Sequence, residues 1–247
     1  MGALILREMS ARYGKSPGGY LWAFTAPLLM IVALTFAFSF LQKTPRLGTS
    51  FIMYYASGHL VFAIFGQVSG PVTAALKFSR PLLRFPTVIW LDTVLARLFL
   101  NALTATVVFF LLLYGIATFS GHGLRFDLIP VLTAVGLALA LGGGFGIFTC
   151  WLFMELPIVA RLWGFTSRPL FIVSGVLFLY EDFPDEVQSV LWWNPLMHIT
   201  SLAKSGIFPK YDPTWISPLY VATIALVLAV AGLFMLRQHH DRLLGRD

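Results

Sequence analysis

The feature that most constrains this chain is a series of long apolar runs separated by short polar segments. The runs cover about residues 22–41, 51–76, 98–119, 128–152, 163–180 and 216–236. A helix needs about 20 apolar residues to cross the hydrocarbon core of a bilayer, and the fifth run is barely long enough. Only 11% of the residues are charged, roughly half the share of a soluble domain. We therefore expect an all-α, polytopic membrane protein with six transmembrane helices in a single domain.

The positions of the 17 lysines and arginines orient these expected helices. If the N-terminus lies in the cytoplasm, twelve of them fall on cytoplasmic segments and five on outer segments. The twelve include Arg161, in an expected cytoplasmic turn over residues 155–161, and the five include Lys204. Because Lys and Arg accumulate on the cytoplasmic side of membrane proteins, this count predicts that both termini are cytoplasmic. A nucleic-acid partner is not expected, since the charges separate apolar runs instead of gathering on one water-facing surface.

Residues 3–14 are expected to form an amphipathic helix that lies along the cytoplasmic membrane surface. Apolar side chains recur there at helical spacing and end at Tyr13, while Arg7, Glu8 and Arg12 occupy the other face. This pattern is typical of a helix in the membrane interface.

A basic segment, residues 77–97, separates the second run from the third, and we call it the elbow. Its four basic residues keep it in the cytoplasm, because each would cost about 3 kcal/mol at the centre of a membrane helix. They are Lys77, Arg80, Arg84 and Arg97. Two prolines divide the elbow into short pieces, and its apolar side chains include Phe85 and Trp90. An apolar surface on a cytoplasmic segment indicates a docking site for a soluble partner.

Residues 181–213 combine acidic residues, four prolines and aromatic side chains. The segment is too interrupted to span the membrane, because proline breaks a helix interior. It is also too apolar to be a free loop. We expect one or two short interfacial or re-entrant helices there, on the outer side of the membrane.

The sequence contains no pattern of catalytic or metal-binding residues. The apolar runs lack paired carboxylates, the five histidines lack the spacing of metal ligands, and a complete phosphate-binding loop is missing. The single Cys150 excludes a disulfide within the chain. We therefore predict no catalytic residue, no metal site and no cofactor in this chain, and an enzyme is the weaker class of function.

Arg168 is the strongest candidate for a residue on a transport path. It lies inside the fifth run, where a charge needs a partner, an anionic substrate or water. Aromatic rings can also line a path for sugars, whose apolar faces pack on them, although rings near span ends are also typical membrane anchors. The candidate aromatic residues are Tyr20, Trp22, Tyr55, Trp151 and Trp163.

Two pairs of glycines have the four-residue spacing that lets membrane helices approach closely. They are Gly66 with Gly70 and Gly142 with Gly146. We expect both pairs to serve helix packing.

Three blocks of the sequence carry a family resemblance. They are REMSARYGKSPGGYLWAFTAPL from position 7, RFPTVIWLDTVLAR from position 84 and WWNPLMHITSLAKSGIFPKYDP from position 192. In this order they resemble the permease subunits of ABC-2 type exporters, and specifically capsular polysaccharide export permeases. The resemblance covers nearly the whole chain. It implies a multi-pass protein of the inner membrane of a Gram-negative bacterium that translocates a lipid-linked, acidic polysaccharide.

The resemblance also implies partners. Two copies of the chain would form the pore, and each would dock a separate ATPase subunit that binds ATP and Mg. A periplasmic co-polymerase and an outer-membrane polysaccharide exporter are further expected partners. The elbow would carry the coupling helix, the N-terminal helix would act as a gate where the substrate enters, and the segment after the fifth span would re-enter from the periplasm. The expected ATPase-coupling residues are Arg84, Phe85, Pro86, Thr87, Val88 and Trp90.

Two alternative functions remain open at this stage. Permeases for O-antigen or teichoic acid export share the same architecture, so the resemblance identifies the class of transporter but leaves these two substrates open. A membrane assembly protein could also use the elbow to recruit a partner without any transport.

Overall fold

The computed structural model describes residues 7–9, 19, 21–81, 83, 89–121 and 126–244, with side chains up to residue 240. This part of the chain is helical and contains no strand. Its elements are α2 (Leu21–Ser39), α3 (Phe51–Thr73), α4 (Ala75–Ser79), α5 (Trp90–Phe119), α6 (Leu128–Glu155), α7 (Pro157–Ile172), the 3-10 helix η1 (Tyr180–Asp182), α8 (Asp185–Leu191), α9 (Pro195–Ile207) and α10 (Pro218–Leu244).

Five described helices are long and apolar enough to cross a membrane, namely α2, α3, α5, α6 and α10. The prediction of an all-helical, polytopic membrane protein is thereby confirmed. Helices α2, α3 and α6 agree with the expected runs to within three residues at each end. Helices α5 and α10 are longer than expected, because polar residues continue a helix beyond the membrane without interrupting its hydrogen bonds.

The fifth expected span differs from the structure. Instead of a helix over residues 163–180, the chain forms α7 over Pro157–Ile172, and a turn follows it. The helix starts early because Pro157 suits the first helical position, where a backbone N–H would have no partner. With 16 residues, α7 is about 24 Å long, which is shorter than the ~30 Å hydrocarbon core. It is therefore not among the five candidate spans.

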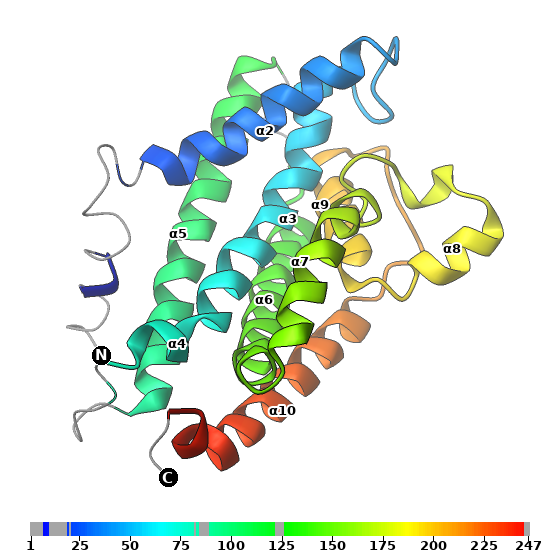
Figure 1. Cartoon of the computed structure of the whole chain (residues 1–247). Helices are drawn as coiled ribbons and strands as arrows, with labels where there is room; N and C mark the ends of the chain where they lie inside the picture. The colour runs from blue at the N-terminus through cyan, green and yellow to red at the C-terminus, as the bar shows by residue number, and fades with distance from the viewer. Residues whose placement is uncertain are drawn as a thin grey trace.

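Helices α3 and α6 form the centre of the protein. Helix α6 contacts α3, α7, α9 and α10, and α3 contacts α2, α5 and α9. Figure 1 shows α2 running obliquely across the ends of α3 and α5. The approach of α6 to α3 is close at Gly146, where a Cβ atom would lie 2.8 Å from Val72 Cβ and 3.0 Å from Ser69 O. Gly142 makes a similar approach, whereas nothing in the described chain lies within 4 Å of a Cβ built at Gly66 or Gly70.

The helices give the molecule two distinct ends. At the elbow end, the ring of Trp90 at the start of α5 lies 5.8 Å from His240 near the end of α10. At the α8 end, the segment 181–213 contains the two short helices α8 and α9. Asn194 caps the N-terminus of α9, because its side-chain oxygen accepts a hydrogen bond from Leu196 N. Helix α9 packs against both α3 and α6.

Candidate functional site

Helix α7 is the described helix that the chain itself covers least. None of its 16 residues is buried, and its main helical neighbour is α6. Trp163 and Phe171 are half-buried on the side that faces the protein, whereas Arg161, Phe165 and Arg168 are exposed. Helix α7 thus presents one open face with two positive charges.

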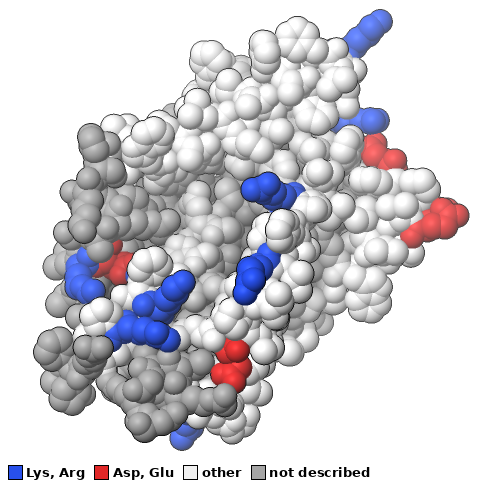
Figure 2. Space-filling view, in the orientation of Figure 1, with Lys and Arg blue, Asp and Glu red and all other residues white. Residues whose placement is uncertain are grey.

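The two arginines lie on the same side of α7. Seven residues separate Arg161 from Arg168, which is about two turns or 10 Å along a helix. Figure 2 shows basic side chains gathered over α7. Within the described part of the chain, neither arginine forms an ion pair or a hydrogen bond. A guanidinium at membrane depth requires water, an anion or another protein surface.

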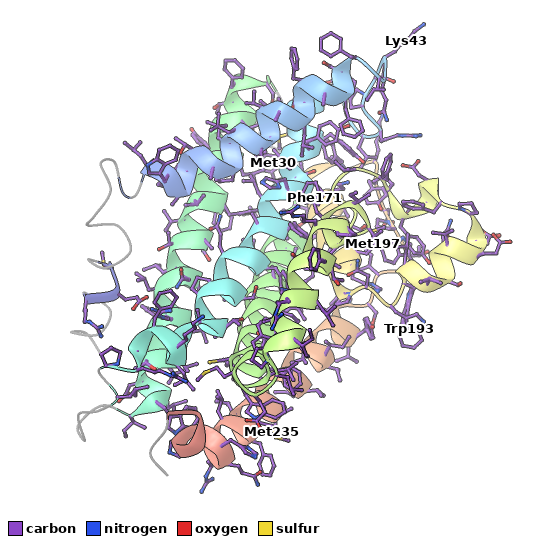
Figure 3. The ribbon with its side chains drawn as sticks, in the orientation of Figure 1. Met30, Lys43, Phe171, Trp193, Met197 and Met235 are labelled. Carbon is purple, nitrogen blue, oxygen red and sulfur yellow. The ribbon has the colours of Figure 1, made fainter. Side chains whose placement is uncertain are left out.

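A ladder of aromatic rings lies between α7 and the two central helices. The ring centroids of Trp163 and Phe145 are 4.6 Å apart, and Phe145 is 5.4 Å from Phe65 of α3. Near the C-terminal end of α7, the ring centroid of Phe171 lies 5.3 Å from that of Phe62 of α3. Figure 3 labels Phe171. Guanidinium groups bind carboxylates and phosphates, and aromatic rings pack on apolar faces. The ladder thus packs α7 against α3 and α6, while the two arginines on its open face can bind anionic groups.

The turn after α7, residues 173–177, is held by side chains from other elements. Four of its carbonyl oxygens accept hydrogen bonds from such side chains. The pairs are Asn194 Nδ2 to Val173 O (2.9 Å), Thr200 Oγ1 to Ser174 O (2.7 Å), Lys204 Nζ to Gly175 O (2.7 Å) and Tyr54 hydroxyl to Leu177 O (3.2 Å). Non-helical backbone at membrane depth is tolerated only where such partners exist. The turn therefore ties the end of α7 to α9 and α3.

Lys204 is a residue of this cluster that the sequence analysis counted only as an outer charge. Its side chain is fully buried, and its ammonium nitrogen lies 4.2 Å from the centre of the Tyr54 ring. The carbonyl of Gly175 and the ring face of Tyr54 compensate part of the cost of burying the charge. The four-residue spacing from Thr200 to Lys204 is the signal that could have placed Lys204 on the buried face of α9.

A second polar cluster stabilises the α8 end. Trp215 Nε1 donates to Glu181 Oε1 at 2.8 Å, and the Tyr211 hydroxyl donates to Glu181 Oε2 at 3.1 Å. The rings of Tyr180 and Trp215 stack at 4.0 Å. Burial raises the pKa of Tyr211 above its ordinary value, so its hydroxyl remains a hydrogen-bond donor. Asp182 pairs with Arg46 of the α2–α3 loop at 3.3 Å.

The structure brings only two of the predicted path residues together on one helix, Trp163 and Arg168. Trp22 is exposed on α2, and Tyr55 is buried in the core of α3, 5.3 Å from Phe38. Trp151 lies at the elbow end, where its ring is 6.2 Å from His239 of α10. The predicted Tyr20 lies outside the described residues. Arg161, which the sequence analysis assigned to a cytoplasmic turn, joins Arg168 instead.

The residues predicted for the elbow and the N-terminal helix are partly described. Arg84, Phe85, Pro86, Thr87 and Val88, like Arg12 and Tyr13, lie outside the described residues, whereas Trp90 is the first residue of α5 and Arg7 is exposed.

Glu8 makes a specific contact with α5. Its Oε1 atom lies 2.7 Å from the Nη2 atom of Arg97, which is buried. The described residues contain no cluster of three or more histidine, cysteine or carboxylate side chains that could hold a metal ion.

These features define a multi-pass, all-helical membrane protein in which the described part of the chain leaves the basic face of α7 open. Residues 1–208 match the ABC-2 type transporter family. The chain belongs to this family and is a membrane-embedded transport component. The family resemblance predicted from the sequence is thereby confirmed.

Relatives with curated names are similar along nearly the whole chain. The chain is 27% identical over 242 residues to the polysialic acid transport protein KpsM of Escherichia coli, covering 98% of this chain and 94% of KpsM. It is 26% identical over 235 residues to the capsule polysaccharide export inner-membrane protein CtrC of Neisseria meningitidis serogroup B (95% and 89%). It is 24% identical over 237 residues to BexB of Haemophilus influenzae, which has the same description (96% and 89%). The relatives and the five candidate spans make this an inner-membrane, multi-pass protein.

Proposed function

We propose that this protein is the permease subunit of an ATP-driven exporter that carries a lipid-linked, acidic capsular polysaccharide across the inner membrane. Its family and the names of its relatives support the class of substrate. The observation that carries the proposal in this chain is the row of Arg161 and Arg168 on the open face of α7. Two unpaired guanidinium groups on an apolar helix suit the repeated negative charges of such a polymer.

The functional unit is proposed to contain two copies of the chain. A lone copy would expose both arginines of α7 to lipid, which is energetically unfavourable. A second copy facing α7 would enclose the arginines in a shared path away from lipid. In this arrangement α7 and the 173–177 turn together complete a sixth crossing, and both termini lie in the cytoplasm with the elbow.

The ATPase is proposed to be a separate subunit that binds ATP and Mg, because this sequence contains no complete phosphate-binding loop. The elbow, which includes the end of α4 and the start of α5, is the proposed docking segment. Its position at the joint between two helices would let a movement of the ATPase tilt α5 relative to α3. A periplasmic co-polymerase and an outer-membrane exporter complete the proposed assembly.

Replacing both Phe85 and Trp90 by glutamate is expected to weaken binding of the ATPase at least about tenfold, because two apolar anchors of an interface are lost. Co-purification of the ATPase with the tagged permease measures this effect. Phe119→Glu is a matched control, because Phe119 is an exposed ring at the opposite end of α5. Normal co-purification and normal export by the double variant would exclude the elbow as the docking surface.

A deletion strain tests the proposed function itself. Without this chain, finished polysaccharide should accumulate in the cytoplasm and disappear from the cell surface, and the wild-type gene should restore it. The composition of the retained polymer separates a capsular substrate from O-antigen or teichoic acid. Unchanged surface polysaccharide would favour a membrane assembly protein that does not transport.

A further inference from the structure

Arg97 of α5 lies where three segments of the chain meet. Its Nη1 atom donates to Pro71 O near the end of α3 at 3.3 Å, and its guanidinium carbon lies 5.1 Å from the centre of the Phe78 ring of α4. Its Nη2 atom lies 2.7 Å from Glu8 Oε1. One side chain thus contacts α3, α4 and the N-terminal segment from its place on α5.

This ion pair is largely shielded from water. The side chain of Arg97 is 10% exposed and that of Glu8 is 18% exposed. Removing one partner of a buried pair leaves an uncompensated charge, which is strongly unfavourable. Arg97 therefore keeps Glu8 in place as long as α3, α4 and α5 keep their present arrangement. A change in that arrangement moves the guanidinium and alters the position that Glu8 prefers.

The Glu8–Arg97 pair lies at the elbow, the segment where the ATPase is proposed to dock. The elbow includes the end of α4 and the start of α5, and within it Arg97 of α5 contacts Phe78 of α4. We propose that the Glu8–Arg97 ion pair transmits movement of the elbow to the N-terminal segment, so that ATPase motion and the position of this segment are coupled. This inference rests on the proposed function, because it assumes an ATPase docked at the elbow.

The pair is tested in the purified complex of permease and ATPase, reconstituted in vesicles. Glu8→Gln removes one charge without a change in size, and Arg97→Gln removes the other with a shorter polar side chain. We expect each to lower the amount of polysaccharide exported per ATP hydrolysed about tenfold, with the double variant no worse than either single one, since residues in direct contact are not additive. Exchanging the charges, with Glu8→Arg and Arg97→Glu together, should recover part of the coupling. ATP hydrolysis and complex assembly should stay near the wild-type level.

Lys43→Gln is the matched control, because Lys43 is an exposed charged residue on the α2–α3 loop, away from the Glu8–Arg97 pair (Figure 3). It should leave the export per ATP unchanged. A wild-type amount of polysaccharide exported per ATP in both Gln variants would overturn the inference. So would a joint loss of complex assembly, ATP hydrolysis and export that the charge exchange does not restore. Failure of the wild-type complex to export or to bind the ATPase would instead contradict the proposed function.

Discussion

Export of the acidic polysaccharide is expected to fall at least about 100-fold when Arg161 and Arg168 are both replaced by glutamate, because like charges brought together cost several kcal/mol. We expect the effect to arise at α7 itself, because both side chains project from its uncovered face without a partner in the described chain. The single change Arg168→Ala should lower export less and leave the dimer intact. Surface polysaccharide per cell, normalised to the amount of permease in the membrane, measures both effects.

Two controls separate a transport defect from misfolding. Lys43→Glu reverses a charge on the loop at the α8 end, away from α7 (Figure 3), and should leave export unchanged. Replacing both arginines by lysine keeps the charge and should retain much of the activity. Wild-type export by the double glutamate variant would show that α7 does not line the path. Loss of the protein from the membrane would assign the arginines a structural role instead.

The second large effect is expected on stability, at Gly175. This residue has φ of 73° in the turn after α7, a conformation that other residues rarely adopt. A Cβ atom there would lie 2.5 Å from Thr200 Oγ1 and 2.6 Å from Met197 Sδ. Gly175→Ala should therefore destabilise the protein by about 3 kcal/mol through backbone strain and overpacking. A thermal-unfolding series followed by size-exclusion chromatography in detergent measures the loss.

Gly115→Ala is the control for this change, because Gly115 lies in α5 and nothing in the described chain is within 4 Å of its added Cβ. It should be neutral or stabilising by about 0.5–1 kcal/mol, as expected for alanine in a helix. Equal thermal stability of Gly175→Ala and the wild type would mean that the 173–177 turn does not hold α7 in the way described.

Hydropathy predicted most helices but missed the bounds of α7. The runs that became α2, α3 and α6 were readable because each is apolar throughout and ends at polar or turn residues. The run at 163–180 is also apolar, yet its last part leaves the helix because Lys204 and Thr200 of α9 satisfy its carbonyls. Such distant partners have no local signal. In the same way, glycine spacing alone did not distinguish Gly146, which faces α3 closely, from Gly70, which does not meet another part of the described chain.

The candidate site was predictable only in part, and for a similar reason. Arg168 was recognisable as a charge within an apolar run, whereas Arg161 seemed to belong to a loop because the start of α7 was placed too late. The partner of Arg97 could not be inferred, because Glu8 is far away in sequence and their contact depends on how the N-terminal segment packs against α5.

The central claim is that this chain moves an acidic polysaccharide through a path beside α7 at the expense of ATP in a partner subunit. The most direct measurement uses vesicles that contain the purified permease–ATPase complex, with lipid-linked polysaccharide supplied on the ATPase side. After addition of ATP and Mg, the polymer should become protected from an added depolymerase, and the variant with Arg161→Glu and Arg168→Glu should hydrolyse ATP without protecting it. Polymer that remains fully accessible while the wild-type complex hydrolyses ATP would contradict the claim.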